Sequence, residues 1–356
     1  MAMFSGIVMA GPTEQDSLRA VLRDYLEERA PVTAALTDPG RTHAFAATFE
    51  PAGLCVPAEF GGAGGSAADA VAVAAESGRA LLGGEILAQL LATAAAVAAP
   101  PSAERGDVLT ALASGAASAT APVWTTPELP HVSETVLAAF PVSHVVAFDC
   151  SSGELRLVWA EIGPDSVELL GGMDPTRPLG RISPEVLSTG AELARGDEAA
   201  DALGRYVAFA RAAIAAEQVA GARHCVELTV KYAGQRTQFG VAIATFQAVK
   251  HTCATMHIDV TEAEALVALA TAAAGEPGSD AARLAAQAKA LASEAFASVA
   301  RSAIEIHGGI GFAWEHPVQL FYKRALVTSA YFGRPDGLYA AALTSSNATD
   351  PVGAAN

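Results

Sequence analysis

A short segment of the sequence combines a cation, a carboxamide and an aromatic ring at a spacing that could bind a phosphorylated ligand. Arg236 is followed by Gln238, Phe239 and Gly240. A guanidinium at this place could hold a pyrophosphate through two parallel, charge-assisted hydrogen bonds, and Phe239 would add an apolar wall. The alternative is an ordinary arginine that caps the C-terminal end of a helix through the helix dipole.

A second segment would let a ligand come close to the main chain. Gly308, Gly309 and Gly311 follow Glu305 in the sequence. Because glycine has no side chain, its amide group can face phosphate or ribose oxygens at short range. The alternative is a loop that merely ends a helix, since glycine is also the usual residue at a helix C-terminus.

Both segments, together with the run from Phe246 to His251, resemble the C-terminal half of the flavin-dependent acyl-CoA dehydrogenases. The resemblance covers most of the chain, is strongest from about 200 to 326, and includes the run from Gly311 to Pro317. It implies FAD as the cofactor, with these segments holding the adenine and pyrophosphate end of a FAD that belongs to the neighbouring subunit. The cofactor-binding residues that it implies are Arg236, Gln238, Phe239, Gln247, Glu305, Gly308 and Gly309.

One of these residues departs from the family pattern. Family members usually carry glutamine where this chain has Glu305. A carboxylate beside a pyrophosphate is repelled unless it faces ribose hydroxyls or is held by a lysine or an arginine. The departure argues against full-strength FAD binding.

The resemblance also implies a reaction, the α,β-dehydrogenation of an acyl-CoA thioester. A carboxylate base removes the α-proton while the β-hydrogen leaves as a hydride to the flavin, so the base must face the flavin. In most family members this base is a glutamate in a Tyr-Glu-Gly-Thr sequence. Phe332 occupies that position here. No catalytic residue is therefore expected at the usual place.

Some family members carry the glutamate on an earlier helix, at a point that corresponds here to Ala210 or Arg211. Neither side chain can act as that base. Glu217 lies about two helical turns beyond Ala210 and would face the same side of a helix, so it is the remaining candidate. The alternative is a buried carboxylate that pairs with Arg211 or Arg223, or that contacts the cofactor indirectly.

The middle of the chain only weakly resembles the segments with which family members cover their own flavin. The two weakly similar segments are Thr125–Glu128 and the residues around Trp159. We expect Trp159 to pack in a small sheet rather than to form a flavin wall. The run from Gly172 to Arg177 matches the family and suggests that the sheet itself is retained.

Proline divides the chain into regions with different secondary structure. Eight prolines lie between 122 and 184, and none lies between 185 and 276. Because proline costs about 3 kcal/mol inside a helix, the second region can hold long helices and the first cannot. The β-branched and aromatic residues at 143–148 and 155–159 predict a hairpin.

Local patterns place further helices on either side of this region. The apolar residues within Glu14–Glu28 recur on one face, as in an amphipathic helix. Near the other end, Ser279 and Asp280 are suitable N-cap residues for a helix that would stop at Gly308.

The order of these elements predicts a mainly α-helical protein with a small central β domain. We expect an N-terminal helical domain at 1–118, a degenerate β-sheet domain at 119–195, a C-terminal helical bundle at 196–345 and a polar tail at 346–356. This order coincides with the layout of the acyl-CoA dehydrogenases, whose C-terminal domain is a four-helix bundle.

Composition limits the partners and the compartment. A net charge of −16 disfavours nucleic acid or an anionic membrane as a partner, because both would be repelled. No apolar run of about 18 residues indicates a transmembrane helix. The four cysteines have no metal-binding spacing, and the N-terminus does not have the layout of a signal peptide. We expect a cytoplasmic protein without a metal site.

Residues for a neighbour's cofactor are thus retained, whereas those for the chain's own active site are missing. This pattern resembles the short subunit of actinobacterial heterotetrameric acyl-CoA dehydrogenases that act on steroid side chains. It implies an α2β2 assembly with a longer catalytic homologue, a bulky acyl-CoA substrate, and electron-transferring flavoprotein as the acceptor. Two alternatives stay open: a self-sufficient homo-oligomeric FAD enzyme that uses Glu217, and a non-catalytic scaffold.

Overall fold

The computed structural model describes residues 14–347 except 39, 125–134, 138–141, 152 and 275–279. Its N-terminal part is helical. The amphipathic pattern near the N-terminus forms α1, and α4 begins at a capping box in which Ser66 and Asp69 bond each other's main-chain amides. The elements are α1 (Glu14–Arg29), η1 (Val32–Ala34), α2 (Arg41–Phe49), α3 (Pro51–Leu54), η2 (Ala58–Phe60), α4 (Ala67–Arg79), α5 (Gly84–Ala98) and α6 (Ala103–Ala113).

Two small sheets follow in the proline-rich region. The predicted hairpin is confirmed: β3 and β4 pair antiparallel, with Val146 opposite Trp159. The first sheet has the strand order β1-β3-β4-β7 and the second β2-β6-β5. The elements are β1 (Ala119–Thr120), β2 (Thr135–Leu137), β3 (His144–Asp149), β4 (Arg156–Glu161), η3 (Pro164–Ser166), β5 (Val167–Leu170), β6 (Leu179–Ile182), α7 (Pro184–Ser188) and β7 (Ala191–Arg195).

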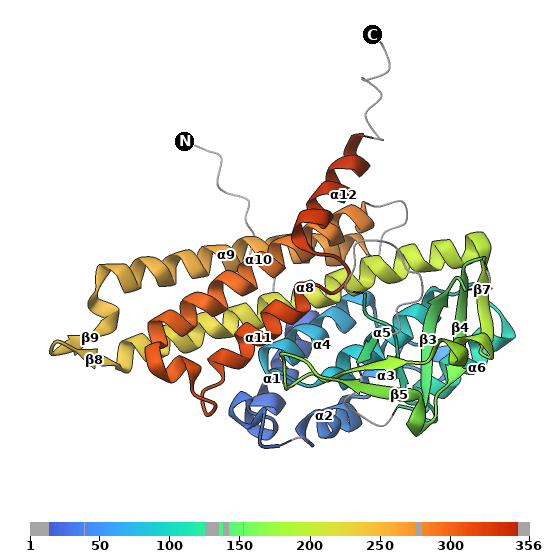
Figure 1. Cartoon of the computed structure of the whole chain (residues 1–356), viewed down its shortest axis with the longest axis horizontal. Coiled ribbons are helices and arrows are strands. Elements are labelled where there is room, and N and C mark those ends of the chain that lie inside the picture. Colours follow the sequence, from blue (N-terminus) through green and yellow to red (C-terminus); the bar gives the residue numbers. More distant parts are fainter. Residues whose placement is uncertain are drawn as a thin grey trace, which may run out of the picture.

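Long helices fill the region that lacks proline. In Figure 1, α8, α9 and α10 lie side by side along the long axis of the molecule, with the sheets at one end and the β8–β9 hairpin at the other. The elements are α8 (Gly196–Gln235), β8 (Thr237–Gln238), β9 (Val241–Ala242), η4 (Ile243–Thr245), α9 (Gln247–Ala273), α10 (Ala281–His307), η5 (Gly308–Phe312), α11 (Val318–Thr328) and α12 (Pro335–Asn347).

Small residues let the helices approach closely. A Cβ atom on Gly78 in α4 would lie only 2.4 Å from the main-chain oxygen and Cγ of Glu217 in α8. Glycine is therefore required where these two helices meet, and any side chain would push them apart. Buried alanines line much of α8 and α10 in the same way, which explains the high alanine content of this part of the chain.

The expected fold class is confirmed, and one local prediction needs correction. Asp280 precedes α10 and Gly308 ends it, as predicted, but the Asp280 side chain binds Arg283 instead of capping the main chain. Ser279 lies outside the described residues. The polar tail at 346–356 stays a proposal, and α12 extends to Asn347.

We keep the domain boundaries at 118/119 and 195/196 as a proposal, since strands begin at Ala119 and the long helix α8 begins at Gly196. Within the described part of the chain, each helix is too short or too polar to span a bilayer.

Candidate functional site

The predicted cofactor-binding residues come together at one end of the helical bundle. Arg236 follows α8, Gln247 begins α9, and Gly308 follows α10. Figure 1 shows this end projecting away from the sheets and the N-terminal helices. We call residues 236–247 and 305–314 the tip. All seven predicted cofactor-binding residues are exposed there: Arg236, Gln238, Phe239, Gln247, Glu305, Gly308 and Gly309.

A contact between α8 and α10 holds the two halves of the tip together. The Tyr232 hydroxyl donates a hydrogen bond of 3.3 Å to the His307 carbonyl, and the two rings stack with centroids 4.4 Å apart. The Arg236 carbonyl in turn accepts a 2.8 Å bond from the amide of Ile243, which closes the β8–β9 hairpin onto α8. The glycine segment therefore lies beside the last turn of α8, close to Arg236.

The hairpin presents Phe239 to the outside. Phe239 is 92% exposed and has a φ of +52°, a left-handed conformation that is uncommon for a residue with a large side chain. Its ring meets Phe246 edge to face, with centroids 6.2 Å apart. Strained backbone at an exposed aromatic residue is typical of a binding site rather than of packing.

The same end of the bundle also offers an unused donor and open main chain. Among the described residues, the Arg236 side chain makes no hydrogen bond or ion pair, and nothing lies within 4 Å of a Cβ atom built on Gly308 or Gly309. Gly308 has a φ of +64°, which a residue with a side chain rarely adopts. A free guanidinium, an aromatic face and accessible amides together fit a phosphorylated, aromatic group such as the ADP portion of FAD.

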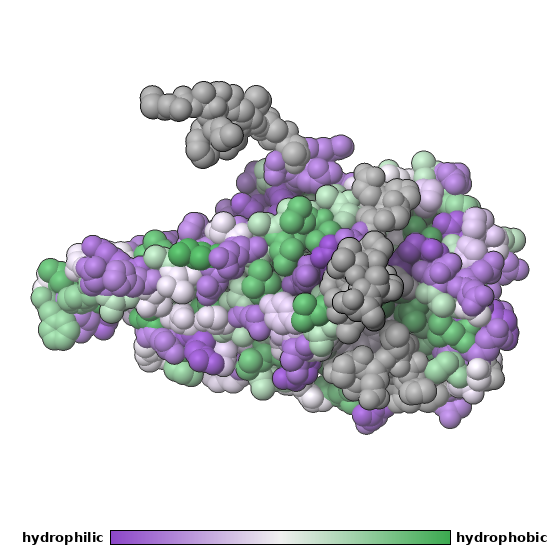
Figure 2. Space-filling view, turned by 90° about the horizontal axis from the view of Figure 1, so that it is seen from above, coloured by the Kyte–Doolittle hydropathy of each residue, from purple (hydrophilic) through white to green (hydrophobic). Residues whose placement is uncertain are grey.

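Large apolar side chains at the tip are exposed in numbers that a free surface rarely shows. Figure 2 shows green, apolar residues at the projecting end. An exposed apolar cluster on a protein surface usually marks a contact with another molecule. Its members, from the hairpin and from the segment around η5, are Phe239, Val241, Phe246, Ile310, Phe312 and Trp314.

The position at which the resemblance places the usual catalytic base is occupied by a packed side chain. Phe332 is only 3% exposed and sits edge to face against Trp124 at 4.7 Å and Tyr206 at 5.8 Å between ring centroids. Its amide donates a 2.7 Å hydrogen bond to the Trp124 carbonyl. Phe148 packs on Tyr206 in the same group. We call Trp124, Phe148, Tyr206 and Phe332 the aromatic cluster; a carboxylate is absent from this position.

The alternative position on α8 also lacks a base. Ala210 is fully buried, and Arg211 donates a 3.0 Å hydrogen bond from Nε to the Phe332 carbonyl. Arg211 thus ties α8 to the segment that carries Phe332. Burial lowers the pKa of Arg211, although its guanidinium keeps its charge at neutral pH.

Glu217 is part of a buried ion network. Its carboxylate accepts hydrogen bonds of 3.0 and 2.5 Å from Arg177 and one of 2.8 Å from Arg324. Arg324 also binds Asp174 through Nε and donates a 2.6 Å bond to the Thr176 hydroxyl. These five side chains are at most 8% exposed. We call them the ion network.

The network corrects one part of the sequence analysis. A paired, buried Glu217 was the alternative to a base, and the structure has that pairing, but with Arg177 and Arg324 instead of Arg211 or Arg223. Arg223 binds Glu264 on α9. Two guanidiniums occupy the oxygens of Glu217, so this carboxylate is not placed to remove a proton from a substrate.

Charge dominates the chemistry of the network. Burial raises the pKa of Asp174, but the charge of Arg324 and the hydrogen bonds from Thr176 and Arg324 outweigh it, so the pKa lies below its usual value. Burial lowers the pKa of Arg324, but its two carboxylate partners, Asp174 and Glu217, raise it by more. The pKa of Arg324 therefore lies above its usual value. Both groups therefore stay charged, and the network links the middle of the chain to α8 and α11.

The roles of Arg177 and Arg324 are not evident from the sequence. Arg177 belongs to the run from Gly172 to Arg177 that resembles the family, so a signal was present for Arg177. It did not reveal that the two arginines meet at one glutamate. Of the two weakly similar segments in the middle region, the one at 125–128 lies outside the described residues. The Trp159 ring stacks on the His144 ring, with centroids 4.4 Å apart, and packs in the sheet as predicted. Over the described ranges, no group of acidic, histidine and cysteine residues could hold a metal ion.

Comparison with known proteins gives a consistent result. Residues 12–116 match the acyl-CoA dehydrogenase N-terminal domain, and residues 201–336 match the acyl-CoA dehydrogenase C-terminal domain. The acyl-CoA dehydrogenase IpdE2 of Mycobacterium tuberculosis is 37% identical over 278 residues, which cover 77% of this chain and 76% of that protein.

Solved structures share the fold at lower identity. A variant of the Tcur3481-Tcur3483 steroid ACAD has a TM-score of 0.78 at 21% identity, covering 94% of this chain and 99% of that one. The ChsE4-ChsE5 complex from Mycobacterium tuberculosis has a TM-score of 0.77 at 19% identity, covering 96% and 99% of the respective chains.

Proposed function

Since this chain belongs to the acyl-CoA dehydrogenase family, we propose that it is the subunit that completes the FAD site of a catalytic partner in a heteromeric enzyme. The cofactor of the enzyme is FAD. When bound, the flavin accepts the hydride that leaves the β-carbon of an acyl-CoA thioester. This chain holds the ADP portion of that FAD and supplies no base.

The observation that carries the proposal is the orientation of the tip. Phe239 is 92% exposed at the end of the molecule that lies farthest from the sheets (Figure 1). A cofactor held there would lie outside the body of this chain. The exposed apolar side chains around it, such as Phe312 and Trp314, fit a contact with a second subunit, which would enclose the cofactor from the other side.

Each tip residue has a role that suits its chemistry. Arg236 would bind the pyrophosphate, Gln238 and Gln247 would donate hydrogen bonds, and Phe239 would cover an apolar face. Gly308 and Gly309 would offer main-chain amides. Glu305, which is exposed at the end of α10, suits ribose hydroxyls better than phosphates because its carboxylate only accepts hydrogen bonds.

The lack of a base in this chain supports a partner subunit that supplies the base. The aromatic cluster fills the place where a glutamate would face a flavin, and Glu217 is enclosed by Arg177 and Arg324. Proton removal therefore falls to the partner, a longer acyl-CoA dehydrogenase homologue in an α2β2 assembly. The likeness to a steroid ACAD supports a bulky steroid side-chain acyl-CoA as the substrate, with electron-transferring flavoprotein as the acceptor.

Flavin content tests the proposal directly. The chain is purified alone and then co-purified with a longer homologue encoded beside its gene, and flavin absorbance is measured per protomer. We expect a colourless chain alone and one FAD per heterodimer in the complex. A yellow homo-oligomer that oxidises acyl-CoA would instead establish the self-sufficient enzyme, and a colourless complex would establish the scaffold.

Substrate preference tests the finer part of the proposal. The reconstituted complex is supplied with a steroid side-chain acyl-CoA and with linear acyl-CoAs, and kcat/KM is measured for each. We expect preference for the steroid thioester. Turnover of linear acyl-CoAs alone would exclude the bulky substrate while leaving the shared FAD site intact.

A further inference from the structure

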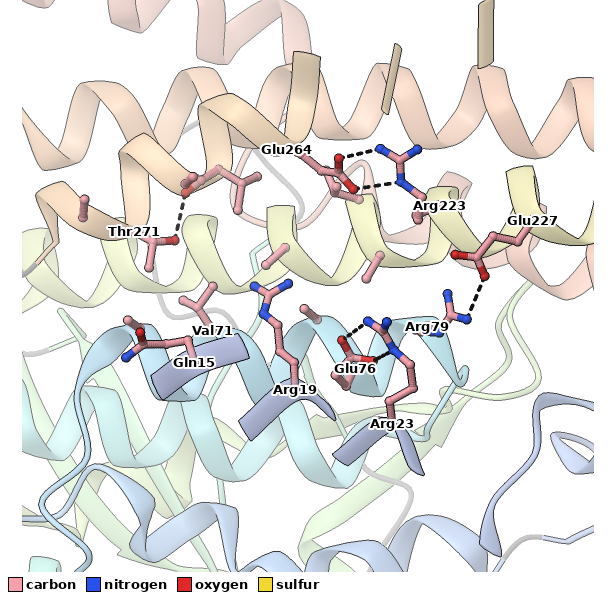
Figure 3. A pocket seen from close by; sticks show the side chains of 18 residues that line it. Gln15, Arg19, Arg23, Val71, Glu76, Arg79, Arg223, Glu227, Glu264 and Thr271 are labelled. Atoms are coloured by element: carbon pink, nitrogen blue, oxygen red, sulfur yellow. Dashed lines mark hydrogen bonds and ion pairs between the residues drawn. The ribbon is translucent and has the colours of Figure 1, made fainter. Parts of the chain in front are cut away.

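A large cavity lies on the side of α8 that faces α1, α4 and α9. Its volume is about 790 Å³, within the range of pockets that hold small organic molecules. Figure 3 shows side chains from all four helices pointing into it. The cavity lies between the N-terminal helices and the C-terminal bundle. No residue of the tip, the aromatic cluster or the ion network lines it.

The contributions of α8 lie on one stripe of that helix. Ala216, Ala220, Arg223 and Glu227 recur at intervals of three and four residues, so they share one face. Glu217, which binds Arg177 and Arg324, faces another direction. The cavity is thus separated by the helix itself from the residues that correspond to the family's base positions.

Every carboxylate in the cavity wall already has an arginine. Arg23 binds Glu76 at 2.7 Å, Arg79 binds Glu227 at 2.7 Å, and Arg223 binds Glu264 at 2.5 Å. These pairs come from different helices, and Figure 3 draws them around the rim of the cavity. Their charges cancel, so they leave no net charge for a ligand.

Among the described residues that line the cavity, Arg19 is the one cation without a carboxylate partner. Its side chain points from α1 into the cavity in Figure 3, and within the described ranges it makes no hydrogen bond or ion pair. Arg19 thus presents an unpaired, partly buried guanidinium to the cavity. It provides the planar donor pair that a single carboxylate binds best.

Apart from Gln15, which donates to Asp69, and Thr271, which donates to the Val267 carbonyl, the remaining wall is apolar. Val71 and Ala75 of α4, Val219 of α8 and Val267 of α9 face the cavity. Such a wall would take a hydrocarbon body, and the single free cation would take one negative charge. A CoA thioester, with several phosphate charges, would need more free cations than this cavity offers.

We propose that this cavity binds an apolar monocarboxylate, with Arg19 holding the carboxylate and the α4, α8 and α9 side chains covering the hydrocarbon. Nothing in this proposal depends on the function of the tip. The ligand would bridge α1 to α8 and α9, and it would bind whether or not FAD is present.

The test uses equilibrium binding of decanoate to the full chain, alone or in its complex, by calorimetry. Decanamide, which has the same hydrocarbon without the charge, is the matched ligand. Arg19→Gln removes the free cation, and Ala268→Glu adds a negative charge at an exposed position of α9 in the wall. Arg29→Gln is the control, because Arg29 lies on the same helix, is 67% exposed and is outside the cavity wall.

We expect saturable binding of one decanoate, at least tenfold weaker binding of decanamide, and at least tenfold weaker decanoate binding by the Arg19→Gln and Ala268→Glu variants. The Arg29→Gln variant should bind as the wild type does. Absence of saturable decanoate binding would overturn the proposal. So would equal affinity for the two ligands, or an Arg19→Gln variant that binds like the control. Unfolding temperatures of the variants check that each one is folded.

Discussion

The ring of Phe332 stands edge-on against the ring of Trp124, with centroids 4.7 Å apart and planes at 88°. The main chain reinforces this contact, since the Phe332 amide donates to the Trp124 carbonyl. A position that carries a catalytic glutamate in most family members is here a packing position. The packing of Phe332 supports the proposal that this chain supplies no base.

A pair of phenylalanines tests this exchange. Phe332 and Phe239 both have a positive φ, but the first is 3% exposed and the second 92%. Phe332→Ala should lower the free energy of unfolding by about 3 kcal/mol, because a large buried side chain is lost. Phe239→Ala should change it by less than about 0.5 kcal/mol. Denaturant unfolding measures both. Equal effects of the two substitutions would contradict the assignment of one ring to the core and the other to a partner.

Arg236→Ala should weaken FAD retention in the complex without affecting the fold. A hydrogen bond to a charged group contributes about 1.5–3 kcal/mol, so the dissociation constant should rise by roughly one to two orders of magnitude. Arg195→Ala is the matched control, because Arg195 precedes the opposite end of α8. Fluorescence titration of FAD into the apo complex gives the constants. Unchanged FAD affinity after loss of Arg236 would show that the ADP site lies elsewhere.

Glu217→Gln should destabilise the protein strongly. It leaves Arg177 and Arg324 without their shared countercharge in a buried place, where breaking an ion pair costs about 3–5 kcal/mol. Glu192→Gln, which breaks an exposed pair with Arg195, should cost no more than about 1 kcal/mol. Thermal and denaturant unfolding compare the two. A stable Glu217→Gln variant that has lost all turnover would favour the base role instead.

Lys289 predicts a pH dependence of stability. Its side chain is fully buried on α10, with uncharged partners: Nζ donates to the Ser293 hydroxyl at 2.8 Å and to the Ser329 carbonyl at 3.3 Å. Burial, together with the charge of Arg211, lowers the pKa of Lys289 to about 7. Between pH 7 and about 10.5 the unfolded chain binds this proton and the folded chain does not, so stability rises with pH in that window.

Lys289→Met removes the titrating amine and with it this pH dependence of stability. The unfolding temperature of the variant should exceed that of the wild type most clearly below pH 7, where the wild type buries a charge, and the difference should shrink as the pH rises toward 9. Lys231→Met, at an exposed position on α8, is the control and should show no such trend. A constant difference from pH 6 to 9 would mean that Lys289 does not titrate in this range.

Local patterns in the sequence predicted the elements and the tip, because both depend on neighbouring residues. The lack of proline from 185 to 276 predicted long helices, and glycine at 308 predicted the end of α10. The run from Arg236 to Gly240 predicted binding residues at the end of a long helix, and the structure places them on a hairpin that projects from the bundle. Such signals are carried by residue type and short spacing, so they survive without a structure.

Contacts between distant residues could not be predicted in this way. Arg177 and Glu217 are 40 positions apart, and Arg324 reaches the same carboxylate from a further 107 positions along the chain. No local pattern tells which of several arginines meets a buried glutamate, so Arg211 and Arg223 were the nearer but wrong choices. The free charge of Arg19 was equally hidden, since it follows from the pairing of every other charged group around the cavity.

Helix α8 has 40 residues and runs without proline, so it spans about 60 Å as a single rod. It carries Tyr206, Glu217, Arg223 and the approach to Arg236. Deleting one residue between Glu217 and Arg236 would rotate the tip by about 100° around the helix axis, whereas deleting seven would nearly restore its direction and shorten the rod by about 10 Å. The angle at which the tip would meet the proposed partner therefore depends on the number of residues in this one helix.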